Sequence, residues 1–197
     1  MAGLYFEQFS VGQTFVHEIR RTVTDMDNIL FSSLTYNPAA VHIDHEYAKS
    51  TEFGKPLMNS IFTLGLIIGI SVQDTTLGTT VGNLGMEETR FPRPVFAGDT
   101  LRAETKILAV RDSKSRPTQG IVTFEHRGFN QRNEEIAYCR RIIRQRREQD
   151  VVHVGDRAPD FMDKGLTDQE LFEVESRHFQ PSLVFRPGIS NYRFSAE

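Results

Sequence analysis

The chain has 197 residues, 39% of them hydrophobic and 25% charged, which suits one sizeable globular domain and is short for two. A formal net charge of −3 argues against nucleic acid as a partner, because phosphate-binding domains usually carry a basic excess. The single cysteine, Cys139, excludes an internal disulfide and a cysteine-based zinc site, and it suits a reducing compartment.

Membrane insertion is not expected, because the sequence contains no apolar run of about 18 residues. The first residues, MAGLYFEQF, lack the basic start and apolar core of a secretory signal and the arginine-rich pattern of a transit peptide. We therefore expect a cytoplasmic protein, with an organelle reached through a removed transit peptide as the alternative.

Two helical segments are predicted in the first third of the chain. Residues 25–34 show apolar side chains at helical spacing, with Thr22 or Thr24 as the N-cap and acidic residues in the first turn. Pro38 blocks continuation of this helix. The stretch HEYAKST predicts a short second helix at residues 45–51.

The most apolar segment, NSIFTLGLIIGISVQDT, covers residues 59–75 and is longer than a typical strand. Asn59 or Ser60 can cap it as a helix. Apolar residues occur on nearly every side, so the pattern predicts a helix buried in the middle of the protein. Gly65 and Gly69 lie four residues apart on one face, where another element can approach the backbone closely.

The rest of the first 147 residues has the alternating pattern of β-strands. One face of the resulting sheet is expected to pack on the central helix. The architecture predicted is therefore α+β, a long curved antiparallel sheet wrapped around one buried helix. The expected strands cover residues 11–24, 79–91, 98–112, 120–130 and 135–147.

The chain is expected to divide after residue 149. Residues 1–149 form the sheet-and-helix domain, whereas charge density and turn content rise beyond it. Residues 150–197 are interpreted as a C-terminal extension, whose aromatic residues pack on a neighbouring subunit or belong to a loosely packed tail.

The stretch NPAAVHID, residues 37–44, carries a family resemblance. The pattern of an acidic or amide residue, two spacers, usually a proline, an aliphatic residue and then His-x-Asp resembles the MaoC-like dehydratases, the hydratase-2 branch of the hotdog-fold superfamily. Ala40 departs from this pattern, because it stands where the family usually has proline. The resemblance spans about residues 5–147, and the His-x-Asp motif alone would be weak.

Within this family, LMNSIFTLGL and SKSRP…GIVTFEHRGFNQ are most similar to the mesaconyl-CoA and itaconyl-CoA hydratases, which act on branched C5 dicarboxylyl thioesters. The resemblance implies a hotdog fold and a hydro-lyase that adds water reversibly across the double bond of a 2-enoyl-CoA. Coenzyme A would be part of the substrate, and no separate cofactor or metal is expected.

The resemblance places the proton-handling chemistry on His42, the expected general base and acid, because histidine titrates near neutrality. Most relatives have aspartate where this chain has Asn37. An amide cannot take a proton at physiological pH, so Asn37 is expected to orient the attacking water, with a simple turn role as the alternative. Asp44 is expected either to fix the tautomer of His42 or to stabilise the loop.

The resemblance also implies a substrate-binding role for backbone N–H groups near Asn59 and Ser60, where a helix N-terminus offers unpaired donors to the thioester oxygen. Most relatives have His-Gly at these two positions. Arg90 or Arg93 is the candidate partner of a substrate carboxylate, with a surface salt bridge as the alternative.

Two competing functions remain open at this stage. A hotdog thioesterase would want a carboxylate near the helix terminus, and KPLMNSIF contains none. The best argument for the other function, a catalytically inactive acyl-thioester-binding subunit, is the missing aspartate at position 37. Because one such sheet exposes an edge and an open site, the resemblance also implies a homodimer or higher homo-oligomer.

Overall fold

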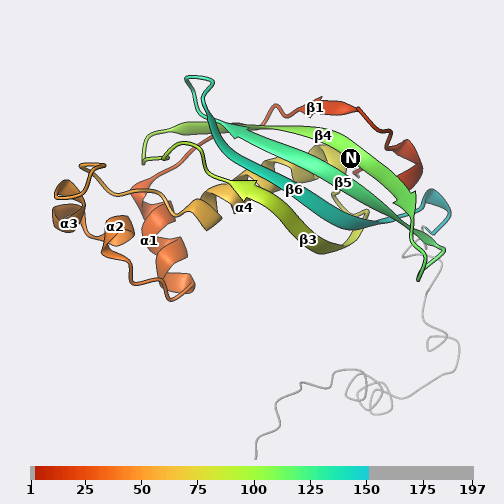
Figure 1. The fold of residues 1–197 in the computed structure, drawn as a ribbon, viewed down its shortest axis with the longest axis horizontal. Helices are drawn as coiled ribbons and strands as arrows, with labels where there is room; N and C mark the ends of the chain where they lie inside the picture. Colours follow the sequence, from red (N-terminus) through yellow and green to blue (C-terminus); the bar gives the residue numbers. More distant parts are fainter. Residues whose placement is uncertain (1–2, 151–197) are drawn as a thin grey trace, which may run out of the picture. The chain divides into compact units, whose positions relative to one another are not determined.

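The computed structural model describes residues 3–150, so the predicted C-terminal extension lies outside the described residues apart from its first position. Figure 1 shows the helices and strands along the chain. The elements are η1 (Phe6–Gln8), β1 (Thr14–Val16), β2 (Arg21–Thr22), α1 (Asp25–Leu34), α2 (Ala40–Ile43), α3 (His45–Lys49), α4 (Ser60–Thr75), β3 (Thr80–Arg90), β4 (Thr100–Asp112), β5 (Gln119–Phe129), β6 (Glu135–Arg146) and η2 (Glu148–Asp150).

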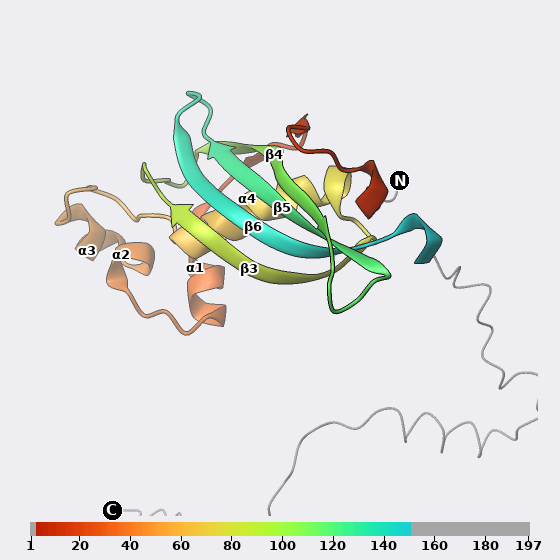
Figure 2. The same cartoon turned by 45° about the vertical axis from the view of Figure 1, so that its right-hand side comes forward.

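The sheet is antiparallel and curves around α4, as Figure 2 shows. Its strands run in the order β1-β4-β5-β6-β3, and β2 pairs with β4 beside this path. The predicted α+β hotdog architecture is therefore confirmed. The predicted strand at residues 11–24 is the least accurate, because it consists of two short pieces, β1 and β2.

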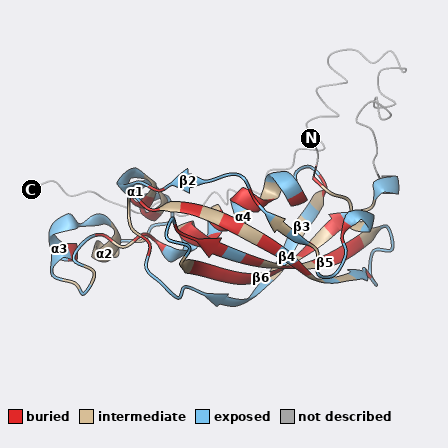
Figure 3. Cartoon of the chain, turned by 90° about the horizontal axis from the view of Figure 1, so that it is seen from above, coloured by how far each residue is buried: buried red, intermediate tan, exposed pale blue. Residues whose placement is uncertain are grey.

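Alternation along the strands places the core between the sheet and α4. On β4, Leu101, Ala103, Thr105 and Ile107 are buried, and the residues between them are more exposed. This is the period-two pattern of a sheet with one face on a core. Figure 3 shows the buried positions concentrated along the sheet and α4, whereas α3 is largely exposed.

The central helix is less enclosed than its sequence predicts. The expectation of burial on nearly every side is wrong for one stripe of α4 in the part of the chain that the structure describes. Ile61, Gly65 and Gly69 are exposed, and a Cβ atom built on either glycine meets nothing within 4 Å. One side of α4 packs on β4, β5 and β6, and the stripe of Ile61, Gly65 and Gly69 is left uncovered.

Helices α1, α2 and α3 gather at one end of the sheet, beside the first turn of α4 (Figures 1 and 2). The bounds of α1 are those predicted, and Thr24 caps it in a capping box with Asp27. Asn59 caps α4 by accepting from the amides of Ile61 and Phe62, as the sequence indicates. Capping side chains therefore fix where both helices begin.

A chain of polar side chains lies farther along α4, and all but the exposed Asp74 are buried. The Nδ1 atom of His17 is 2.7 Å from Asp74 Oδ2, and its Nε2 atom is 2.8 Å from Thr105 Oγ1. That hydroxyl also lies 3.0 Å from Nδ1 of His126, which is 1% exposed. Burial, together with the nearby positive charges of Arg141 and His17, lowers the pKa of His126 from 6.5 to about 3.

The low pKa of His126 predicts that the protein loses stability in mild acid. Above pH 6.5 the imidazole is neutral in both states, but below it the unfolded chain binds a proton that the folded chain does not bind. Between pH 7 and pH 5 this difference removes about 2 kcal/mol from the free energy of unfolding. Urea unfolding followed by circular dichroism at both pH values measures the loss, which should be smaller in His126→Gln. Equal losses in the two proteins would contradict the assignment.

Candidate functional site

Four of the residues singled out by sequence lie around one cleft. Asn37, His42, Asn59 and Ser60 line a hollow of about 320 Å³ beside the N-terminus of α4. They come from the loop after α1, from α2, and from the first turn of α4. Phe31, Thr35 and Ile61 complete its lining. Residues as far as 23 positions apart in the sequence, Asn37 and Ser60, are thereby brought to one surface.

The orientation of His42 is set by a backbone carbonyl. Its Nδ1 atom lies 2.7 Å from the carbonyl oxygen of Leu57. A carbonyl oxygen only accepts hydrogen bonds, so Nδ1 carries the proton and Nε2 of the neutral ring holds a free lone pair. His42 is half-buried and lines the cleft. The residue therefore has the tautomer that a base acting through Nε2 requires.

Asn37 uses its side-chain oxygen within its own loop. Oδ1 accepts a hydrogen bond from the amide of Ala39 at 3.0 Å, which identifies the other side-chain atom as the nitrogen. No acceptor among residues 3–150 pairs with that nitrogen. The side chain thus combines the turn role with a free NH₂ group at the cleft, able to donate to a water oxygen.

Asp44 does not hold His42. Its carboxylate accepts from the amides of Glu46 at 2.9 Å and Tyr47 at 3.0 Å, which makes it the N-cap of α3. The expected role in fixing the tautomer is therefore wrong, because the Leu57 carbonyl occupies Nδ1 of His42. The second expected role, loop stabilisation, is the one that the hydrogen bonds support.

The first turn of α4 leaves one backbone donor for a ligand at the cleft. The Asn59 amide donates to Asn28 Oδ1 at 2.9 Å, and the amides of Ile61 and Phe62 point to Asn59 Oδ1. The amide of Ser60, the first residue of α4, has no intrahelical acceptor in reach. Of the backbone amides predicted to bind the thioester oxygen, near Asn59 and Ser60, that of Ser60 is the one left for a ligand. The helix dipole also favours negative charge there.

A second, largely apolar pocket of about 220 Å³ adjoins the cleft. Ser60 lines both hollows, so both border the N-terminus of α4. An apolar pocket with few polar groups is the usual form of a site for a small organic ligand. Its lining consists of Phe53, Leu57, Met58, Ser60, Thr63, Phe91, Pro92, Arg93, Pro94, Val95 and Ile136.

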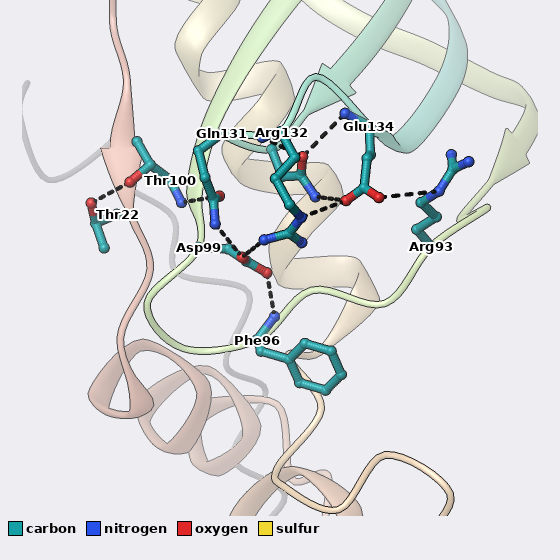
Figure 4. Close-up of polar contacts among 9 residues, drawn as sticks. Thr22, Arg93, Phe96, Asp99, Thr100, Gln131, Arg132 and Glu134 are labelled. Atoms are coloured by element: carbon teal, nitrogen blue, oxygen red, sulfur yellow. Dashed lines mark hydrogen bonds and ion pairs between the residues drawn. The ribbon is translucent and has the colours of Figure 1, made fainter.

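The two candidate arginines occupy different places. Arg93 lines the apolar pocket, and its guanidinium lies 4.0 Å from Glu134 Oε1 and 3.4 Å from the Glu135 carbonyl. Figure 4 shows it at the end of a polar network that runs through Glu134 to the turn after β5. Arg90 instead lies with Cζ 4.1 Å from the centre of the Tyr138 ring, and it does not line the pocket.

The network in Figure 4 ties the turn after β5 to the loop before β4. Asp99, 6% exposed, accepts from Gln131 at 2.8 Å and from the Phe96 amide at 3.0 Å. Arg132 donates to Glu134 at 2.8 Å, so the carboxylate facing Arg93 already holds another arginine. Glu134 therefore anchors Arg93 only weakly, which leaves guanidinium donors for a ligand.

Sequence reasoning missed Asn28 on α1. It is 1% exposed, and its side chain bonds the backbone of His42, Leu57 and Asn59. A polar residue within an amphipathic helix ordinarily faces water, so the pattern gave no signal for it. Within residues 3–150, no three His, Cys, Asp or Glu side chains gather in a way that could hold a metal ion.

The described helices also give no candidate for a membrane span, since within residues 3–150 none combines the length and apolar character required.

Comparison with known proteins gives related sequences and folds. The chain is 32% identical over 148 residues to a mesaconyl-CoA hydratase of Cereibacter sphaeroides, which covers 75% of this chain and 43% of that protein. It is 31% identical over 162 residues to a β-methylmalyl-CoA dehydratase of Chloroflexus aurantiacus, covering 82% and 46%. A Mycobacterium tuberculosis protein with a double hotdog fold matches in structure with a TM-score of 0.68, at 22% identity, covering 75% and 46%.

The chain spans less than half the length of each of these relatives. The model of the MaoC-like domain matches residues 7–128, which include α1 to α4 and most of the sheet. That match covers the whole cleft around His42. The chain belongs to the family of MaoC-like domain proteins.

Proposed function

We propose that the protein is a hydro-lyase that adds water reversibly across the double bond of a 2-enoyl-CoA thioester. The observation that carries the proposal is the placement of His42, with a free Nε2, and the Ser60 amide around one cleft. The reaction requires a base for water, a donor for the thioester oxygen and an acid that protonates Cα, and the protonated imidazole can serve as that acid. The names of the relatives, a hydratase and a dehydratase of CoA thioesters, support the same class.

The proposed reaction uses one imidazole twice. Asn37 Nδ2 donates to the water, and Nε2 of His42 removes a proton from it as the oxygen bonds to Cβ. The π electrons move onto the thioester oxygen, where the Ser60 amide and the α4 dipole stabilise the enolate. Nε2 then returns the proton to Cα, and the products balance as one water added to one double bond.

The competing hypothesis, that the protein is a thioesterase, has less support. Thioester hydrolysis through a carboxylate base or nucleophile needs an acidic residue at the cleft. None of the seven described residues that line the cleft is aspartate or glutamate.

Replacing His42 tests this function most simply. His42→Gln should lower the hydration rate by at least about 100-fold, because no other side chain lining the cleft exchanges a proton near neutrality. Loss of enoyl-thioester absorbance without release of free thiol measures hydration. His45→Gln, in the exposed helix α3, is the matched control and should keep the parent rate.

Thiol release by the parent protein would indicate a thioesterase instead, and CoA-thioester binding without turnover would indicate an inactive subunit. Full hydration by His42→Gln would remove His42 from the mechanism.

We further propose a short branched dicarboxylyl-CoA, such as mesaconyl-CoA or itaconyl-CoA, as the substrate. Arg93 lines an apolar pocket that shares Ser60 with the cleft, and its weak pairing with Glu134 leaves guanidinium donors for a carboxylate. The name of the Cereibacter relative points to the same substrate class.

Arg93→Gln should separate carboxylated from uncarboxylated substrates. It should lower kcat/KM for mesaconyl-CoA by about 10- to 100-fold, the usual effect of losing a charge-assisted hydrogen bond. Tiglyl-CoA, in which a methyl group replaces the carboxylate, should react equally with both proteins. Arg90→Gln is the control, because Arg90 faces Tyr138, outside the pocket lining. Equal losses on both thioesters in Arg93→Gln would contradict the carboxylate role.

A second copy of the chain is the proposed macromolecular partner. The exposed stripe of Ile61, Gly65 and Gly69 continues from the cleft, since Ile61 also lines it. In the described sheet β3 is an edge strand, and its Val81, Leu84 and Met86 are 38%, 45% and 45% exposed. Apolar surface of this kind marks an interface. The relatives of about twice the length, one with a double hotdog fold, support pairing of two such units.

Gly65→Leu should disrupt this assembly and leave the single fold intact. A side chain at Gly65 meets open space within one chain, and glycine is the poorer helix former, so the isolated chain gains stability. The added bulk would keep a second copy away from the stripe. Light scattering after gel filtration should give a dimer or larger for the parent and for Gly65→Ala, and a monomer for Gly65→Leu. A monomeric parent would contradict the proposal.

A further inference from the structure

The side chain of Asn28 connects the two halves of the candidate site. Its Nδ2 atom donates to the carbonyl of His42 at 2.7 Å and to the carbonyl of Leu57 at 3.0 Å. Its Oδ1 atom accepts from the amide of Asn59 at 2.9 Å. One buried carboxamide thus holds the helix that carries the base, the chain segment that orients the base, and the residue that caps α4.

This arrangement requires an amide. Two of the partners of Asn28 are carbonyls, which only accept, and the third is an N–H group, which only donates. Aspartate would place an oxygen against both carbonyls, and leucine would leave all three groups without a partner. Buried backbone groups without partners cost about 1–3 kcal/mol each, so the match of donors and acceptors matters.

The carbonyl of Leu57 is shared between Asn28 and His42. It accepts from Nδ2 of Asn28 and from Nδ1 of His42, and the second bond determines which ring nitrogen faces the cleft. The hydrogen bond from Asn28 fixes the direction of the Leu57 carbonyl and competes with His42 for the electron density of the same oxygen. Asn28 therefore influences both where Nε2 points and how strongly the ring is held.

The Asn28 side chain also determines which backbone amide at the cleft is free to donate to a ligand. With the Asn59 amide tied to Asn28, and Asn59 Oδ1 tied to the amides of Ile61 and Phe62, the Ser60 amide is the one left for a ligand. The distance between Nε2 of His42 and this amide therefore depends on the three hydrogen bonds of the Asn28 side chain. Displacements of about 1 Å between reacting groups can cost 100-fold in rate.

We propose that Asn28 is a positioning residue. It holds the His42 imidazole and the N-terminus of α4 at a fixed distance and orientation, so that the base and the oxyanion donor act on one thioester. The proposal rests on the proposed hydro-lyase function. Asn28 itself lines neither the cleft nor the apolar pocket and touches no reacting atom. Its effect is expected on turnover and proton transfer, with little effect on substrate affinity.

The test compares Asn28→Asp and Asn28→Ala with Ser32→Ala. Ser32 lies one turn later on α1, is fully buried, and its hydroxyl has no partner among the described residues, so its loss should be silent. Both Asn28 variants should lose about 10- to 100-fold in kcat, with a change in KM of about threefold or less. The acidic limb of the kcat pH profile should move to higher pH, because the Leu57 carbonyl, freed of its second donor, holds the protonated ring more strongly.

Amide hydrogen exchange of the parent protein gives an independent readout that needs neither activity nor a variant. The Asn59 amide should be protected by Asn28, and the Ser60 amide should exchange faster. Asn28 variants that fold and keep the parent kcat and pH profile would overturn the proposal, as would a rapidly exchanging Asn59 amide in the parent. Parallel loss of kcat and folded fraction with an unmoved pH profile would overturn it too, by showing a purely structural role.

Absence of hydration by the parent protein would refute the proposed function itself, whereas a fully active Asn28→Ala would refute the positioning role alone.

Discussion

The hydrogen bond between Nδ1 of His42 and the carbonyl of Leu57 is the interaction on which the site depends. It selects one tautomer, and with that choice it presents Nε2 as the basic atom. Leu57 is itself fixed, since its amide donates to the Val41 carbonyl and the next amide, that of Met58, donates to Val95. Backbone hydrogen bonds to α2 and to the loop between β3 and β4 thus fix the segment that holds the imidazole, and the short helix α2 has no capping side chain of its own.

The amide at Asn37 gives the chemistry its particular form. An aspartate there would offer a second proton carrier, whereas the amide offers a donor to water and an acceptor already used by the loop. In the proposed reaction one imidazole takes the proton from water and returns it to Cα, which requires the water and the returned proton to approach the same face of the substrate. In the proposed reaction the enolate charge develops beside the Ser60 amide, at the N-terminus of α4, where the helix dipole stabilises it.

Local patterns predicted much of the fold. The bounds of α1, the capping role of Asn59 and the four long strands follow from side-chain periodicity and from the hydrogen-bonding capacity of single residues. The family pattern also gathered four residues that the structure brings to one cleft. The hydrogen-bond partner of His42 could not be predicted, because it is a backbone carbonyl. Every residue has one, and the leucine side chain at position 57 does not indicate that this carbonyl accepts from a histidine.

Asn28 was missed for a related reason, since only the tertiary fold shows that a polar residue of an amphipathic helix is buried against three backbone groups. The sequence marked the face of Gly65 and Gly69 on α4 as a place of close approach, but it did not predict that this face is exposed. Ile61 and the glycines are apolar, and periodicity does not distinguish a face packed on the chain's own sheet from one left for a partner.

The tautomer of the neutral His42 ring tests the proposed catalytic base most directly. Nitrogen-15 NMR of protein labelled in its six histidines, with His42 assigned by the signal lost in His42→Gln, distinguishes a protonated ring nitrogen from an unprotonated one. The account predicts, for the neutral ring, a proton on Nδ1 and an unprotonated Nε2. A proton on Nε2, with Nδ1 unprotonated, would contradict the hydrogen bond to Leu57 and with it the proposed base.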